Sequence, residues 1–347
     1  MVRSVNAGDR AIDYLRDITN PQLTFNESVD YETWKEQIKS KFLDLTGYNL
    51  IKENACPSNI KIEEEVECDG YKRIRFIFNS ENGVVVPAYL LIPNTGKEKY
   101  PVAITLQGHS TGFHNSVGIV KFEQDKDYIE DRGDFAVQAV KQGYVALSIE
   151  QRGMGEVKPD GNGYRNGQMC VYTADIMFML GRTLVASRCW DISRAIDCLS
   201  NFKECDLDKI LITGNSGGGT ASYYAACLDE RIKLSVPSCA VSTYKKSILN
   251  QFHCACNFIP SAYRYFEMAD ISCMLAPRQL IVVTGSVDSI FPIQSTYDAF
   301  DTIKKIYKKA GKAENCKLVV TPKGHWWCKD IVWNEIKNKT TEMGWWK

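Results

Sequence analysis

The stretch that decides the fold is ILITGNSGGG, residues 210–219, which is followed by the helix-compatible run 220–228. Its apolar start predicts a buried strand, the pattern Gly-x-Ser-x-Gly comes next, and the following residues favour a helix. A serine on a sharp turn between a strand and a helix is typical of a nucleophile elbow. Glycines are needed two positions either side of Ser216, because side chains there would collide with the adjoining strand and helix.

A glycine-rich nucleotide-binding turn is the alternative interpretation of this stretch. It is disfavoured because no lysine follows the glycines and the spacing of the third glycine is wrong for a dinucleotide-binding fingerprint. The sequence therefore predicts that Ser216 is a nucleophile.

A serine hydroxyl needs a neighbouring base, and the chain has only 4 histidines, namely His109, His114, His253 and His325. In folds with such an elbow, the acid and then the histidine follow the serine, each in the loop after a late strand. His325 follows a predicted strand at 317–320, and Asp288 follows one at 280–284. We predict His325 as the general base and Asp288 as the acid that orients it.

Other carboxylates are weaker candidates for the acid. Glu150, at the end of a different predicted strand, is the main rival to Asp288. The remaining candidates lie within a helix or before a strand, namely Asp270, Asp298 and Asp301.

An acyl-transfer site also needs two amide donors for the oxyanion. The backbone amide of Gly217, directly after the nucleophile, is the first. The second is expected in the loop 107–112, which follows a predicted strand at 102–106, and we assign it to the amide of His109.

The remaining pattern predicts an α/β fold. Three β-rich runs at 60–66, 71–78 and 84–92 predict an antiparallel entry, because a turn cluster at 79–83 separates the last two. From residue 101 short apolar strands alternate with amphipathic helices at 133–142, 174–202, 217–228 and 293–310. This alternation predicts a mostly parallel sheet with helices on both faces.

The domain organisation expected is one catalytic domain with two additions. Residues 1–58 form a helical N-terminal extension, and residues 59–347 form the catalytic domain. An insertion at 237–277, rich in aromatic residues, is expected as a lid or pocket wall at the carboxyl edge of the sheet.

The amino-acid composition limits the classes of partner that are expected for this protein. The 42 basic and 42 acidic residues balance, so nucleic acid and anionic membranes are not expected as partners. Residues 1–20 lack the apolar core of a secretory signal, and no run of about 18 apolar residues occurs elsewhere. The 13 cysteines lie mostly in apolar segments. Together these features indicate a cytoplasmic protein with free thiols. Self-association through the helical extension is left open.

A metal site is not predicted. Cys254 and Cys256 form a tight pair beside His253, but the usual four-ligand spacings are absent, and packing thiols are the favoured interpretation. No metal, nucleotide or flavin cofactor is expected.

A wider set of segments resembles the α/β hydrolases of the acetyl-xylan-esterase-like and dienelactone-hydrolase-like branch, over roughly residues 80 to 330. The segments are 150–155, 214–219, 254–260, 269–271, 275–278, 285–292 and 324–326. The resemblance implies an α/β-hydrolase fold and a Ser-His-Asp triad. One departure is Gln107, where relatives usually have histidine before the glycine of the donor loop.

The function expected is hydrolysis of short acyl esters, with an acetylated sugar as the first substrate class. Trp326, Phe258 and Glu150 are predicted to line the substrate pocket, the aromatic rings as stacking surface for sugars. A peptidase or amidase of the same fold is the leading alternative, and a catalytically inactive binding protein is the third.

Overall fold

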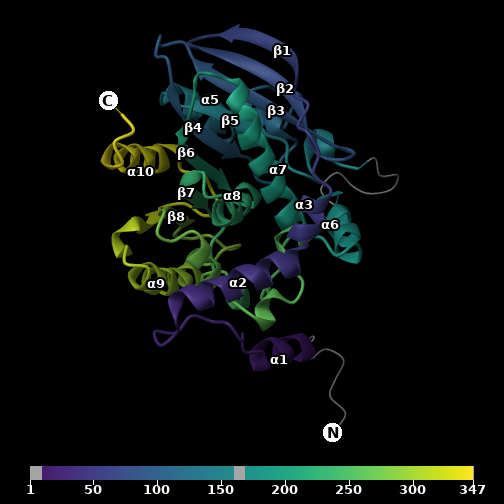
Figure 1. The fold of residues 1–347 in the computed structure, drawn as a ribbon, viewed down its shortest axis with the longest axis vertical. Helices are drawn as coiled ribbons and strands as arrows, with labels where there is room; N and C mark the ends of the chain where they lie inside the picture. Colours follow the sequence, from purple (N-terminus) through teal and green to yellow (C-terminus); the bar gives the residue numbers. More distant parts are fainter. Residues whose placement is uncertain (1–9, 160–168, 347) are drawn as a thin grey trace.

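The computed structural model describes residues 10–159 and 169–346. The expectation that residues 1–20 contain no secretory signal falls partly on residues 1–9, which lie outside the described residues. Within the described residues nine strands form one sheet, in the order β1-β2-β3-β5-β4-β6-β7-β8-β9 (Figure 1). The antiparallel entry is formed by β1 (Lys61–Cys68), β2 (Tyr71–Glu81) and β3 (Val84–Pro93). β3 also pairs antiparallel with β5, and all the remaining neighbours, from β5 through β4 to β9 in the sheet order, pair in parallel.

The parallel part confirms the predicted α/β class, with the expected strands present and their ends shifted. These strands are β4 (Tyr100–Leu106), β5 (Val145–Ile149), β6 (Cys205–Asn215), β7 (Ile232–Ser238), β8 (Gln279–Gly285) and β9 (Cys316–Thr321). Since parallel strands end at the same edge of a sheet, the loops after β4, β5, β6, β8 and β9 meet there.

Helices cover both faces of the sheet, and a separate hydrophobic cluster fills each interface. One face carries α5 (Phe135–Lys141) and α10 (Lys329–Glu342). The other carries α7 (Leu184–Cys198), α8 (Gly217–Leu228) and α9 (Ile293–Lys309). Shorter helices are α1 (Arg10–Ile18), α3 (Tyr48–Glu53) and α4 (Asp125–Tyr128).

The prediction of one helix over 174–202 is wrong. The chain forms α6 (Met169–Met179) and then α7, with a turn between them in which Gly181 has φ 70°. A left-handed residue ends a helix, and the apolar periodicity continues across it because both helices bury one face.

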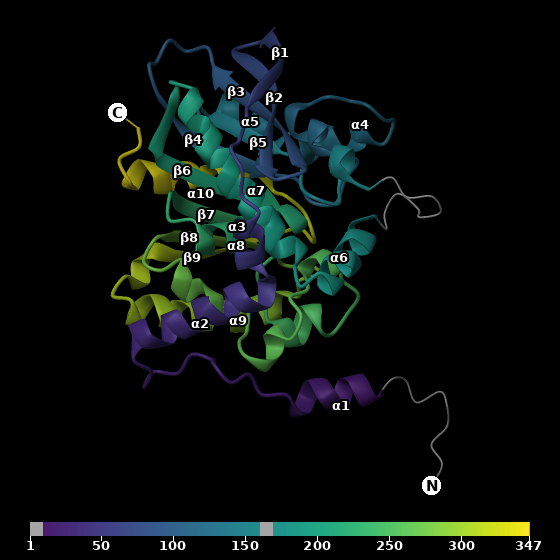
Figure 2. The same ribbon diagram turned by 45° about the vertical axis from the view of Figure 1, so that its right-hand side comes forward.

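The N-terminal helices and the insertion between β7 and β8 share one core with the sheet. Phe42 of α2 (Tyr31–Thr46) is fully buried, and its ring stacks on Tyr224 of α8 at 5.6 Å and lies 6.4 Å from Phe266 of the insertion. Figure 2 shows α2 across the base of the molecule, with α1 beyond it. The helix α2 is thus packed as part of the catalytic body, whereas the apolar side chains of α1, such as Tyr14 and Leu15, are mostly exposed.

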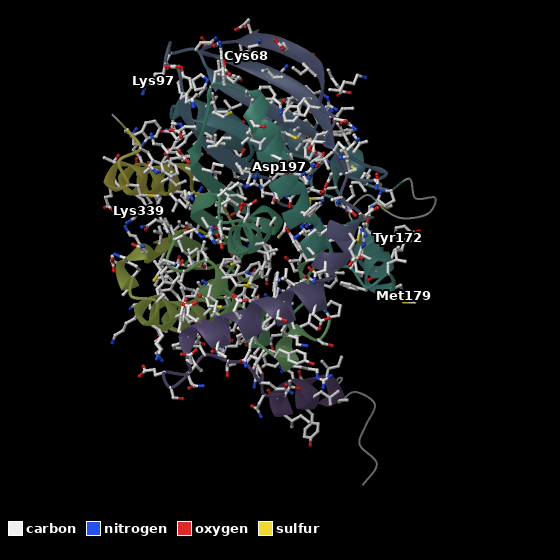
Figure 3. The ribbon with its side chains drawn as sticks, viewed as in Figure 1. Cys68, Lys97, Tyr172, Met179, Asp197 and Lys339 are labelled. Carbon is white, nitrogen blue, oxygen red and sulfur yellow. The ribbon has the colours of Figure 1, made fainter. Side chains whose placement is uncertain are left out.

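Among the described residues no single helix has both the length and the apolar character needed to cross a membrane. One pair, residues 169–179 with 184–201, meets the criterion only when taken together, across a bend of 98°. Met179, at the outer end of α6, is 88% exposed and points away from the body (Figure 3).

Candidate active site

Ser216 lies on the turn between β6 and α8, as the sequence predicts. Its backbone has φ 58° and ψ −124°, a conformation that costs a non-glycine residue free energy and is held only when the surroundings enforce it. A Cβ on Gly218 would lie 2.1 Å from the carbonyl oxygen of Leu106, so only glycine fits there. The amide of Ser216 donates to the carbonyl of Ser238 at 2.9 Å, which fixes the turn against the end of β7.

Asp288 and His325 are in direct contact in the loops after β8 and β9. His325 Nδ1 lies 2.9 Å from Asp288 Oδ2, and the other carboxylate oxygen accepts the amides of Ile290 at 2.8 Å and Phe291 at 3.0 Å. Burial alone would raise the pKa of Asp288, but the hydrogen bond and charge of His325 and these two amides outweigh it and hold the pKa below its ordinary value. The carboxylate is therefore ionised and orients the imidazole.

Cys239 connects the elbow to this pair. It follows Ser238, the residue bonded to the amide of Ser216, and its sulfur lies within 4.8 Å of both the Asp288 carboxylate and a His325 ring nitrogen. Ser216, Asp288 and His325, the three residues that the sequence predicts as a triad, thus lie at one edge of the sheet.

The loop 107–112 after β4, predicted as the donor loop, packs directly on Ser216. A Cβ on Gly108 would lie 3.1 Å from the Cβ of Ser216, so the backbone of the loop passes within van der Waals reach of the serine. The amide of Gly217 is at the first position of α8, where helix geometry leaves an N–H without an acceptor in the helix and the dipole favours negative charge. The amide of Gly217 and the backbone of the donor loop at Gly108 therefore both lie next to Ser216.

Glu150 lies beneath this loop and is fully buried. Its carboxylate accepts Gln107 Nε2 at 2.8 Å and the amides of Phe113 and Glu156, each at 3.2 Å. Burial raises the pKa of Glu150 to about 7 in spite of these amides. His325 is not among the partners that the structure gives Glu150, which holds the donor loop through Gln107 and Phe113.

Glu150 should make stability depend on pH. Its folded pKa of about 7 lies above the ordinary 4.5, so its ionisation costs nothing below about pH 4.5, and the penalty grows until about pH 7. We expect the free energy of unfolding of the wild type, relative to Glu150→Gln, to fall by about 3 kcal/mol between pH 4 and pH 8. Urea unfolding of both proteins at the two pH values measures this, and a difference that is constant with pH would contradict it.

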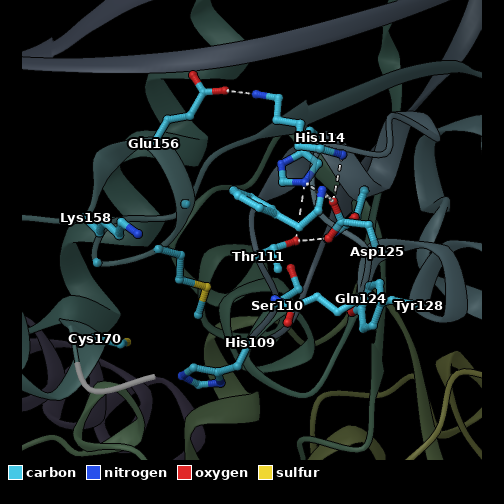
Figure 4. Close-up of a pocket in the computed structure, with 16 residues that line it drawn as sticks. His109, Ser110, Thr111, His114, Gln124, Asp125, Tyr128, Glu156, Lys158 and Cys170 are labelled. Atoms are coloured by element: carbon cyan, nitrogen blue, oxygen red, sulfur yellow. Dashed lines mark hydrogen bonds and ion pairs between the residues drawn. The ribbon is translucent and has the colours of Figure 1, made fainter. Parts of the chain in front are cut away.

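A cavity of about 690 Å³ opens along the donor loop (Figure 4), and Ser216, Asp288 and His325 are not among the residues that line it. Two of its lining residues, His109 and Met154, lie 3.6 Å from the position of a Cβ on Gly217. Polar groups of the donor loop and of the segment after it also line the cavity, among them Ser110, Thr111, Asn115 and Gln124. The wall combines apolar contact surface with hydroxyl and amide groups.

A buried Asp125 fixes the far wall of the cavity. It accepts the hydroxyl of Thr111 and the amides of Lys121 and Phe122, and lies 3.0 Å from His114 Nε2. Burial would raise the pKa of Asp125, but the hydroxyl and amide donors outweigh burial and lower it to about 2. The wall is therefore built around an ionised carboxylate that is fully hydrogen-bonded.

Comparison with known proteins shows the family of this chain. Residues 9–232 match the sequence profile of the Abhydrolase family. The chain belongs to this family. The match begins in the N-terminal extension and includes the elbow, so the extension is part of what this α/β hydrolase shares with its relatives.

Individual relatives are more distant. Bacillus subtilis (strain 168) "Putative hydrolase YtaP" is 25% identical over 242 residues, 69% of this chain and 77% of that protein. A Bacteroides fragilis "putative acetyl xylan esterase" superposes with a TM-score of 0.72 at 17% identity, covering 92% of this chain and 83% of that one. A glucuronoyl esterase from Solibacter usitatus gives 0.66 at 16% identity, covering 92% and 96%. At these identities the structural matches confirm the α/β-hydrolase fold.

The predicted pocket residues of this α/β hydrolase lie elsewhere. Phe258 packs against the main core, and Trp326 lies half-buried in the His325 loop with Lys323 Nζ 5.1 Å from its ring centroid. Neither they nor Glu150 line the cavity along the donor loop. Their part in binding a substrate stays a prediction.

His253 is separated from the two cysteines that follow it. Its Nε2 lies 3.1 Å from the Ser247 hydroxyl, and its ring meets Phe291 edge-on, which in turn stacks on His325. Burial and the nearby His325 lower the pKa of His253 to about 4, so it stays neutral. His109, far away in sequence, lies by Cys256 instead, with Nε2 3.6 Å from Sγ.

Proposed function

We propose that this hydrolase is a serine carboxylesterase that cleaves short acyl esters, acetyl esters first, through Ser216, His325 and Asp288. The observation that carries the proposal is a strained serine at the same sheet edge as a hydrogen-bonded Asp288–His325 pair. Strain of this kind in a non-glycine residue is typical of a catalytic turn.

In the proposed reaction the Ser216 oxygen attacks the ester carbonyl carbon while His325 Nε2 accepts the hydroxyl proton. The oxyanion that forms accepts the amides of Gly217 and His109. The C–O bond to the alcohol breaks, and His325 gives the proton to the departing alkoxide. Water then attacks the acyl-serine, with His325 again taking and returning the proton, and releases the carboxylic acid. Asp288 stabilises the imidazolium at each stage.

The substrate class rests on the cavity and the neighbours. The cavity beside His109 has a volume sufficient for a small sugar ester, and its hydroxyl and amide groups match the hydroxyls of a sugar. Two structural neighbours are named as a putative acetyl xylan esterase and a glucuronoyl esterase. We therefore propose an acetylated carbohydrate as the alcohol side of the substrate.

A panel of esters and one amide tests this function. The panel comprises p-nitrophenyl acetate, butyrate and octanoate, acetylated xylo-oligosaccharide and p-nitroacetanilide. We expect kcat/KM to be highest for acetyl esters and the anilide to be cleaved at least about 10²-fold more slowly than the acetate ester. Faster cleavage of the anilide would favour an amidase, and acetate release from the oligosaccharide no faster than from aryl acetates would remove the carbohydrate assignment.

The donor loop offers a sensitive variant. A methyl group on Gly108 would lie 2.9 Å from the Asn215 carbonyl and 3.1 Å from Ser216 Cβ, so Gly108→Ala should displace the loop by a fraction of an ångström. We expect kcat for p-nitrophenyl acetate to fall about 10²-fold with KM little changed, because the oxyanion donor moves. A Gly108→Ala enzyme with wild-type kcat would contradict the assigned donor.

We also propose a reducing compartment, the cytoplasm, as the place of action. All 13 cysteines are unpaired, and most of them are buried. Free thiols in such number persist where glutathione and thioredoxin keep them reduced. Fractionation of cells that produce the untagged protein tests this.

A further inference from the structure

Four soft ligand atoms gather beside the donor loop and take no part in the proposed ester chemistry. They belong to His109, Cys170, Cys254 and Cys256, and all lie within 4.8 Å of one another. They come from three separate parts of the chain, the loop after β4, the start of α6 and the insertion between β7 and β8. The sequence places only two of them together.

The spacing matches a tetrahedral zinc ion. Bond lengths of about 2.3 Å to sulfur and 2.0 Å to nitrogen put a cysteine sulfur about 3.5 Å from a histidine nitrogen. His109 Nε2 and Cys256 Sγ are 3.6 Å apart. Sulfur ligands at such an ion lie about 3.8 Å apart, so the 4.8 Å limit on the group requires inward movements of about 1 Å or less.

The charge of the surroundings also favours a zinc ion at this position. Arg188 of α7 is 3% exposed, and its guanidinium donates to the Cys170 sulfur at 3.1 Å and to the Arg152 carbonyl at 2.8 Å. Among the described residues no carboxylate lies within ion-pair distance of Arg188. A buried cation needs an anionic partner, because an isolated buried charge is costly.

A zinc ion with three thiolates and one neutral imidazole carries a net charge of −1. Arg188 supplies the compensating +1 and a hydrogen bond to a ligand sulfur, the usual role of a group that orients a metal ligand. Three uncharged thiols would leave the guanidinium without a counter-charge. The charge balance therefore favours a metal–thiolate centre over a group of packing cysteines.

We infer that His109, Cys170, Cys254 and Cys256 form a Cys₃His zinc site that ties the donor loop to α6 and to the β7–β8 insertion. Each coordinating thiol releases its proton to solvent. His109 would bind through Nε2, and its opposite ring edge, Cε1 and Nδ1, faces the Gly217 position at 3.6 Å. The metal would thus fix the loop that carries the His109 amide, and this last consequence rests on the proposed function.

Metal content and a cobalt spectrum test the site directly, without reference to activity. Untagged wild-type protein is purified without chelators and dialysed, and its zinc content is measured by elemental mass spectrometry. We expect about one zinc ion per chain. Replacement by Co²⁺ should give the visible bands of a tetrahedral ion and a thiolate-to-cobalt charge-transfer band. Cys170→Ala and Cys256→Ala should lose the metal, whereas Cys205→Ala, which removes a buried cysteine outside the cluster, should retain it.

Two results would overturn the inference. The first is wild-type protein that binds neither zinc nor cobalt with thiolate bands. The second is protein purified without reductant in which two of the cluster cysteines form a disulfide, so that the chain is two hydrogens lighter. Those two cysteines would then be a redox pair. The cobalt spectrum uses the intact wild type, so misfolding of a variant cannot imitate failure.

The effect on catalysis is measured separately. Removing the zinc should lower kcat for p-nitrophenyl acetate about tenfold, because the donor loop loses its anchor. Re-addition of Zn²⁺ should restore the original kcat. Zinc bound without any such change would overturn the loop-fixing role alone. A protein that binds zinc but hydrolyses no ester would contradict the proposed function and leave the metal site standing.

Discussion

Ser216→Ala should lower kcat for p-nitrophenyl acetate by about 10⁵- to 10⁶-fold, the loss typical of removing the nucleophile from a triad. Alanine keeps the Cβ and the backbone, so the elbow, with its Ser216 amide bonded to Ser238, should persist and substrate binding should change little. The residual rate over water would come from the oxyanion donors and binding alone.

Ser222→Ala is the matched control. Ser222 is a buried serine of the same helix, and its hydroxyl donates to the Gly218 carbonyl four residues earlier, away from the reacting atoms. Its loss should leave kcat near that of the wild type. A Ser216→Ala enzyme with most of its activity would remove the mechanism.

Asp288→Asn should lower kcat by about 10⁴-fold. The asparagine oxygen can still accept the amides of Ile290 and Phe291, so the loop should keep its shape. The neutral amide cannot stabilise the imidazolium, and its NH₂ group favours the tautomer of His325 that has no hydrogen on Nδ1 and therefore presents a protonated Nε2 to the serine.

Glu150→Gln separates the two carboxylates that the sequence put in competition for this role. Glu150 contacts Gln107 and backbone amides, and His325 is not among its partners. Glutamine can accept both amides, and the Gln107 side chain can turn so that its carbonyl, which has no partner in the described structure, accepts the new NH₂ group. We expect at most about a tenfold loss of kcat, and a larger loss for Glu150→Gln than for Asp288→Asn would make Glu150 the acid.

The elbow and the positions of the strands along the chain could be predicted because their signals are local. Residues 210–228 specify a strand, a glycine-flanked serine and a helix, and the structure has β6, Ser216 and α8 there. The acid and base follow from topology, because parallel strands end at one edge and place the loops of Asp288 and His325 together.

What could not be predicted depends on contacts between distant segments. The sequence around Glu150 does not indicate that Gln107 Nε2 will lie 2.8 Å from its carboxylate. A buried carboxylate at a strand end nevertheless needs such a donor. The sequence also suggested His253 as the neighbour of Cys254 and Cys256, whereas the fold supplies His109 and Cys170. Side-chain direction decides both cases, and periodicity does not encode it.

The most direct test of the central claim is to treat the native protein with a fluorophosphonate and identify the modified residue by peptide mass spectrometry. A phosphonate ester forms when an activated serine oxygen displaces fluoride, so the reagent reports nucleophilicity without any assumption about the substrate. We expect one adduct per chain, on the peptide that contains Ser216, and none after denaturation. A label on another residue, or none on a protein that still hydrolyses esters, would contradict the account.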